Sequence, residues 1–259
     1  QEATLNSADD IMVRAQEIAT QGANESLSWQ DRQLLADEVF QLRAQMVSLG
    51  NSTYQGRYIY GAAADGNAPF TALTYTAPAA TTDPAHDRFV YNADAEAGSA
   101  ITRNVQITDD DSIKINTPGD EVFSASIGAL ERLGRSLAGY RTGVNATTGL
   151  PDGTGTAYVQ PTDFREQTHD IQTALDAIDS ARNNDIISER SSVGSRINRL
   201  ERVSEILSSL RASTETSRSA LQDTDTFDAA AIYSSLQTSL QALLASGAQI
   251  NNLSLLNYI

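Results

Sequence analysis

Side chains able to perform covalent or acid–base chemistry are few in this 259-residue chain. Cysteine is absent, which removes thiolate nucleophiles, disulfides and zinc sites that need sulfur. Lys114 is the only lysine beside seventeen arginines, so a phosphate loop with Gly-Lys-Ser/Thr is missing and Schiff-base chemistry would depend on one residue. Neither His86 nor His169 has a neighbouring pattern typical of a catalytic base. The sequence therefore favours a protein that is not an enzyme and uses no cofactor.

Two acidic stretches have the residue types of a calcium site. Asp109-Asp110-Asp111 offers consecutive carboxylates, but it lies at an expected hairpin turn, where a solvated turn is the simpler interpretation. Residues 92–98 alternate acidic side chains as a calcium loop does, yet glycine comes one position late and no glutamate follows at the required distance. We expect no metal ion at either stretch.

Charge and hydropathy restrict the classes of partner. The 18 basic and 33 acidic residues give a net charge of -15, which repels nucleic acid and anionic membrane surfaces. No run approaches the roughly 18 apolar residues of a membrane span, and the start of the chain lacks the pattern of a cleaved secretory signal. We therefore expect neither nucleic acid nor membrane as a partner.

Proline and glycine divide the chain into two helical arms around a turn-rich insertion. All six prolines and 11 of the 16 glycines lie between Gly61 and Pro161. We expect a mainly α-helical arrangement: a discontinuous helical domain whose N- and C-terminal arms form an elongated rod, with a small inserted β domain. The expected parts are an N-terminal arm (1–60), the β domain (61–120), a helix and loop that return to the rod (121–161), a C-terminal arm (162–225) and a terminal assembly helix (226–259).

The first arm is expected to hold two helices. Apolar residues recur every three or four positions over 5–19, and Gly22 is expected to end this helix. Ser28, with Asp31 three residues later, is typical of an N-cap, and a heptad stripe over 35–49 follows.

Aromatic residues of the first arm have two interpretations. Trp29, the only tryptophan, is expected to staple the start of the second helix rather than to form a platform for a ligand. Tyr54, Tyr58 and Tyr60 are expected to pack at a hinge rather than to form a binding patch.

The insertion differs in kind from the arms. Short strands are expected at 88–91, 103–108 and 112–116, the last two with alternating apolar residues. Helical spacing returns between residues 118 and 140, with Asp120 as the expected cap.

The second arm is expected to pack against the first. Its apolar residues continue at helical spacing from Ile171 to Leu210, and Asn183 and Asn184 mark a candidate break.

The last segment has an apolar stripe with two interpretations. The stripe packs back on its own rod, or it forms a seam with another molecule. The candidate assembly interface comprises Ile232, Leu236, Leu240, Leu243, Leu244, Ile250, Leu253, Leu255, Leu256 and Tyr258.

Three strings together resemble one family. They are Gly56-Arg-Tyr58-Ile59-Tyr60-Gly61, Ile115-Asn116-Thr-Pro118-Gly119-Asp120-Glu-Val122-Phe123, and the terminal Leu253-Ser-Leu255-Leu256-Asn-Tyr258-Ile259. In this order they are similar to the family of flagellar hook-associated protein 3, the hook–filament junction proteins related to flagellin. Flagellin shares the terminal pattern, whereas the middle strings favour the junction family.

The resemblance implies a structural subunit of the bacterial flagellum that joins hook to filament. It implies assembly by helical packing after type III export, an extracellular location and secretion without a cleaved signal. The implied partners are other copies of the chain, the first hook-associated protein, flagellin and a flagellar export chaperone. It also implies an N-terminal segment that would pair with residues 226–259 as a coiled coil; no such segment precedes Gln1 in this sequence.

Alternatives to a junction subunit remain open. The chain fits a flagellin filament subunit, or a secreted binding module whose helices act as a stalk. A pocket that gathers a histidine and two carboxylates would instead favour an enzyme.

Overall fold

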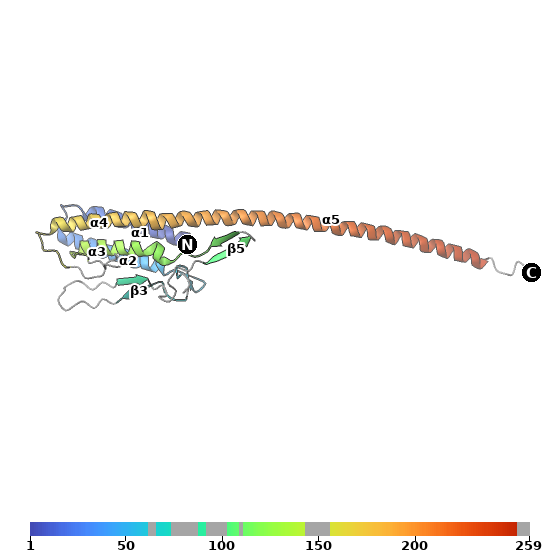
Figure 1. Cartoon of the computed structure of the whole chain (residues 1–259), viewed down its shortest axis with the longest axis horizontal. Coiled ribbons are helices and arrows are strands. Elements are labelled where there is room, and N and C mark those ends of the chain that lie inside the picture. Colours follow the sequence, from blue (N-terminus) through green and yellow to red (C-terminus); the bar gives the residue numbers. More distant parts are fainter. Residues whose placement is uncertain (62–65, 74–87, 92–102, 109–110, 143–155, 253–259) are drawn as a thin grey trace, which may run out of the picture. The chain divides into compact units, whose positions relative to one another are not determined.

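The computed structural model describes all residues except 62–65, 74–87, 92–102, 109–110, 143–155 and 253–259. It is mainly helical with small strand pairs, which confirms the expected fold class (Figure 1). The chain divides into two compact units, Gln1–Asn198 and Arg199–Ile259, which we describe separately. The five-part division drawn from the sequence stays a prediction.

The first two helices of unit 1 lie where the sequence places them. They are α1 (Glu2–Gly22) and α2 (Trp29–Gly50). Ser28 caps α2, because its Oγ accepts a hydrogen bond of 3.2 Å from the backbone N–H of Asp31. α1 ends at Gly22 as expected, and its C-cap is Ala23, in a right-handed conformation. A Cβ at Gly22 would collide with the Leu137 side chain, so this glycine permits close packing.

A π-helical segment, η1 (Asp120–Ser124), precedes α3 (Ala125–Ala138). Asp120 does not cap the helix as expected. The N-cap of η1 is Gly119, and the Asp120 carboxylate accepts a hydrogen bond of 2.6 Å from the Ser124 hydroxyl. The C-cap of α3 is Gly139, whose φ of 95° is a left-handed conformation that glycine adopts without strain.

Helical structure then continues from α4 into α5 without the expected break. The elements are α4 (Phe164–Ala181), the π-helical segment η2 (Arg182–Ile187) and α5 (Ser188–Asn252). Asn183 and Asn184 lie within η2, so the sequence signal for a break marks a wider helical turn instead.

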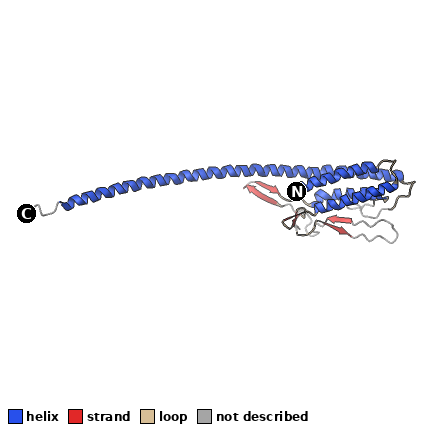
Figure 2. Ribbon diagram, turned by 180° about the vertical axis from the view of Figure 1, so that it is seen from behind, coloured by secondary structure: helices blue, strands red, loops and turns tan. Residues whose placement is uncertain are grey.

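The helices of unit 1 pack into one bundle. α2 packs against α3, α3 against α4, and α1 against both α2 and α4. Figure 2 shows these helices side by side from behind. A buried ion pair between Arg43 and Glu131 also joins α2 to α3. The largest fully buried apolar side chains are Leu5, Met12, Ile18, Met46, Tyr60, Phe123, Leu130, Leu133, Leu137, Ile171 and Ile178.

The strands form three separate antiparallel pairs rather than one sheet in the part of the chain described. The pairs are β1 (Thr53–Tyr54) with β2 (Arg57–Tyr58), β3 (Phe70–Leu73) with β4 (Arg88–Tyr91), and β5 (Asn104–Thr108) with β6 (Asp111–Lys114). The three strands expected from the sequence correspond to β4, β5 and β6; β1 to β3 were not predicted. Residues 92–98 and 109–110 lie outside the described residues, so neither candidate calcium stretch is tested.

Aromatic packing attaches the β3–β4 pair to the bundle. Phe70 and Phe123 meet edge to face with ring centroids 6.3 Å apart, and Tyr60 lies 4.8 Å from Phe123. Asn51 holds the backbone of Phe70 by accepting from its N–H and donating to its carbonyl oxygen, each at 2.8 Å. Tyr60 is therefore a packing residue, as expected, whereas Tyr54 is exposed.

Candidate assembly surface

Polar contacts fix the first turns of α5 within unit 1. The Glu189 carboxylate accepts a hydrogen bond of 2.6 Å from the Thr117 hydroxyl and pairs with Arg196. Arg196 also donates to the Lys114 carbonyl oxygen at 3.0 Å. Val193 is 6% exposed and is the last buried residue of α5 among those described.

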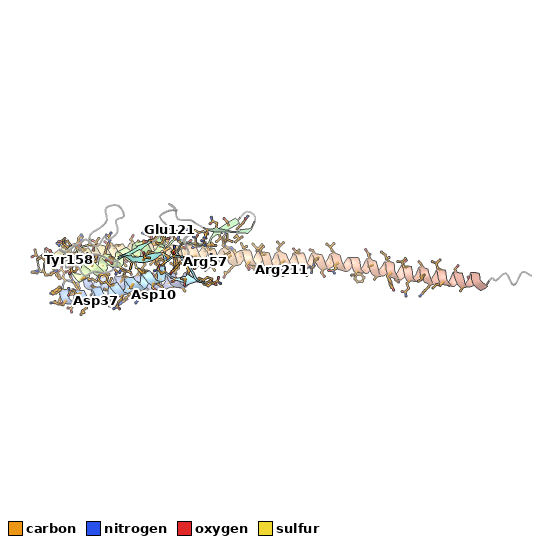
Figure 3. All side chains as sticks on the ribbon, turned by 90° about the horizontal axis from the view of Figure 1, so that it is seen from below. Asp10, Asp37, Arg57, Glu121, Tyr158 and Arg211 are labelled. Atoms are coloured by element: carbon orange, nitrogen blue, oxygen red, sulfur yellow. The ribbon has the colours of Figure 1, made fainter. Side chains whose placement is uncertain are left out.

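Unit 2 presents two groups of exposed apolar side chains. No described side chain of this unit is buried, and Val203 alone among them is half-buried. The proximal patch consists of Leu200, Ile206, Leu207 and Leu210. The distal patch consists of Phe227, Ile232, Tyr233, Leu236, Leu240, Leu243 and Leu244, which are 58% to 78% exposed. Residues 211–226 lie between the patches and contain one large apolar side chain, Leu221, which is 72% exposed. Arg211, labelled in Figure 3, begins this interval.

The structure describes half of the interface residues expected from the sequence. Ile232, Leu236, Leu240, Leu243 and Leu244 are all exposed members of the distal patch. Ile250 belongs to α5, but its side chain lies outside the description. Leu253, Leu255, Leu256 and Tyr258 also lie outside the described residues. That these residues form an assembly interface stays a prediction.

Three residues of the proximal patch do not have the role that the sequence predicted for them. Leu200, Leu207 and Leu210 were expected to pack against the first arm, but they are exposed. Periodicity could not reveal this, because buried and exposed stripes on a helix share the same spacing.

The amino-acid composition distinguishes the segment that carries most of the distal patch. Residues 229–259 contain no Asp, Glu, Lys, Arg or His, although 20% of the whole chain is charged. Their polar positions hold only serine, threonine, glutamine, asparagine and tyrosine. A helix face that stays in water normally carries charged side chains. The missing charge therefore favours a segment that is covered by other protein when it functions.

Ion pairs between described residues of unit 1 shift the pKa values of their carboxylates. Arg141 Nη2 lies 3.0 Å from Asp163 and 2.6 Å from Glu166. The Val159 N–H, followed by this guanidinium, holds the pKa of Asp163 below its usual range, and Arg141 lowers the pKa of Glu166. These shifts stabilise ionised partners and do not create an acid–base pair.

Residues with metal-binding or acid–base potential do not gather in the described part of the chain. His169 is exposed on α4, and His86 lies outside the described residues. Among the residues described, no group of three or more His, Cys, Asp or Glu side chains is placed to hold a metal ion. The described helices also include none with the length and hydropathy needed to cross a membrane.

Comparison with known proteins identifies the type of helix that carries the distal patch. Residues 175–259 match the family model of the bacterial flagellin C-terminal helical region. This part of the chain is therefore similar to the C-terminal helical region of bacterial flagellin. The candidate assembly surface therefore lies within the part of the chain that matches this family. No curated protein matches the chain by sequence.

Solved structures show the same fold over most of the chain. FlgL from Xanthomonas campestris is 18% identical, with a TM-score of 0.63 over 85% of this chain and 92% of that protein. Flagellar hook associated protein-3 from Legionella pneumophila is 18% identical, with a TM-score of 0.57 over 86% and 91% of the two chains. FlgL from Bacillus cereus is 19% identical, with a TM-score of 0.51 over 81% and 87%. The resemblance drawn from the sequence is thus confirmed, and the fold is that of FlgL.

Proposed function

We propose that this chain is a structural subunit of the bacterial flagellum that joins the hook to the filament. The observation that carries the proposal is the exposed distal patch on a helix that matches the flagellin C-terminal region. The FlgL-like fold supports the junction rather than the filament as its place.

The size of the distal patch supports association. Full burial of one large apolar side chain contributes about 1.5–3 kcal/mol, and the seven members retain more than half of their surface to bury. Together they offer roughly 7–14 kcal/mol. That amount is comparable with the roughly 4–15 kcal/mol that association costs in lost motional freedom. The patch is therefore large enough to drive assembly when all its members are covered.

The proposed partners follow from this role. Residues 226–259 act as the assembly segment, and other copies of the chain, the first hook-associated protein and flagellin cover it. A flagellar export chaperone binds the chain before type III export, which needs no cleaved signal. The protein acts outside the cell, in a structural rather than a catalytic role.

Deletion of the gene tests the proposal directly. Cells without the protein should build hooks but lose filaments, and they should release flagellin into the medium. Expression of the gene from a plasmid should restore filaments. Deletion cells that keep attached filaments would contradict the proposal.

A filament subunit is the second candidate, because the matching family model is that of flagellin itself. The same deletion separates the two functions. Loss of a filament subunit would remove the main protein of purified filaments, whereas loss of a junction subunit would leave that protein abundant in the medium.

A further inference from the structure

A cavity of about 360 Å³ lies in unit 1, at the end of the bundle where α2 begins and α3 ends. Trp29 and Gln33 line it from α2, and Tyr158 and Gln160 line it from the segment before α4. Figure 3 shows Tyr158 near this end of the helices. The cavity is independent of the α5 patches, and the proposed function does not use it.

Aromatic side chains form part of its wall. Trp29 is 45% exposed and lines the cavity, so it does not serve only to staple the start of α2 as the sequence suggested. Tyr158 is buried, and its hydroxyl is hydrogen-bonded to Asp170, which fixes the ring. Tyr140 contributes a third aromatic side chain. The exposed Trp29 ring offers an apolar face to a ligand, whereas the buried Tyr158 ring has the Arg141 guanidinium 4.8 Å from its centroid and serves as fixed wall.

The floor of the cavity is a fixed amide. Gln167 is buried, and its Oε1 accepts hydrogen bonds from Arg32 at 3.1 Å and from Gln160 at 3.0 Å. Its Nε2 donates to the Ser136 carbonyl oxygen at 2.8 Å. Because Arg32 is itself fully buried, it holds the floor in place without entering the cavity lining. The cavity is therefore preformed.

Some polar groups of the cavity lining are available for hydrogen bonds with a ligand. The Trp29 indole N–H and the Gln33 amide make no hydrogen bond to the part of the chain that the structure describes. Gln160 donates through its nitrogen, which leaves its carbonyl oxygen as an acceptor. The described residues of the lining thus combine donors and acceptors with aromatic faces, and none of them is charged.

We propose that this cavity binds a neutral hexopyranoside. The sugar ring has an apolar C–H face that packs on an aromatic ring, and hydroxyl groups that both donate and accept hydrogen bonds. These match the indole, the two glutamine amides and the uncharged lining. A purely apolar ligand would bury the Gln33 amide without a partner, which is unfavourable. The volume is in the range of small-molecule sites in proteins.

Trp29 supplies the assay, because it is the only tryptophan of the chain. The full chain is titrated with methyl glycosides of glucose, galactose, mannose and N-acetylglucosamine while indole emission is recorded. At least one glycoside should give a saturable change with a dissociation constant of about 1 mM, the affinity typical of a ligand this small. Sorbitol, which has no ring face, should give none. Saturation-transfer NMR on the same mixtures provides a second readout.

Variants locate the binding. The double change Gln33→Ala and Gln160→Ala keeps the reporter and should weaken the titration by about tenfold or more, since two hydrogen-bonding groups are lost. Tyr54→Ala, an exposed aromatic change outside the cavity lining, should leave it unchanged. Absence of a signal for every glycoside in both methods overturns the proposal. A signal that the double variant retains also overturns it, because the sugar then binds elsewhere.

Discussion

Replacement of Leu240 by aspartate should separate assembly from folding. Leu240 lies near the middle of the distal patch and is 58% exposed. Full burial of a leucine side chain contributes about 1.5–3 kcal/mol, so roughly 1–2 kcal/mol remains to be gained in an assembly. Aspartate forfeits that gain and adds several kcal/mol for a buried, unpaired carboxylate. Each subunit contact should therefore weaken by well over tenfold, while unfolding changes by no more than about 0.5 kcal/mol.

Two measurements test the two halves of this expectation. Thermal unfolding followed by circular dichroism should give the same midpoint for Leu240→Asp and the unchanged chain. In cells that lack the gene, the full-length variant should leave hooks without filaments under the electron microscope. Ser213→Asp is the matched control, because Ser213 lies on the same helix in the interval between the two patches.

Either of two results would refute the reasoning. A lowered unfolding midpoint for Leu240→Asp, with none for Ser213→Asp, would place the leucine in a folded core. Normal filaments with both variants would show that the distal patch is not an assembly surface.

Three further outcomes are expected. Backbone amides of residues 204–249 should exchange with deuterium much faster than those of α3, because an isolated helix without packed side chains is marginal; mass spectrometry that finds equal protection would contradict this. Gly134→Ala should lower the free energy of unfolding, measured in urea, by about 1–3 kcal/mol, because the new Cβ would lie 2.8 Å from the Phe40 ring. Gly194→Ala is the control: it has open space around it and should not destabilise the protein. Burial raises the pKa of Tyr60 above its ordinary 10.0. The stability that this neutral hydroxyl contributes should therefore be constant below pH 10 and be lost above it, because only the unfolded chain ionises there. Tyr60→Phe should make the alkaline loss of stability shallower, and an unchanged profile would exclude this tyrosine as its cause.

The helices of unit 1 were predictable because their signals are local. The apolar spacing over 5–19 and the Ser28 cap each depend on residues within a few positions of one another, and both appear in the structure as expected. Strands β1 to β3 were missed because two to four residues carry too little alternation to recognise.

Features that depend on distant residues could not be predicted from the sequence. α1 ends at Gly22 as expected, but the close contact that this glycine permits with Leu137, on another helix, left no local signal. Asn183 and Asn184 have the composition of a break, yet the neighbouring Ile178 and Ile186 are both buried and keep the chain helical across them. Tertiary packing overrides local preference at these positions.

The exposed patches of α5 show a second limit of prediction from the sequence. Ile178 and Leu207 follow one helical spacing, but Ile178 is buried by the bundle and Leu207 is exposed. Spacing identifies which face is apolar and cannot say whether the same chain covers it. The amino-acid composition supplies information that the spacing does not. Residues 229–259 carry leucines on one face, and their polar positions hold no charged side chain. A face that stays in water would hold lysine or glutamate there, so we propose that other protein covers this segment on more than its leucine side.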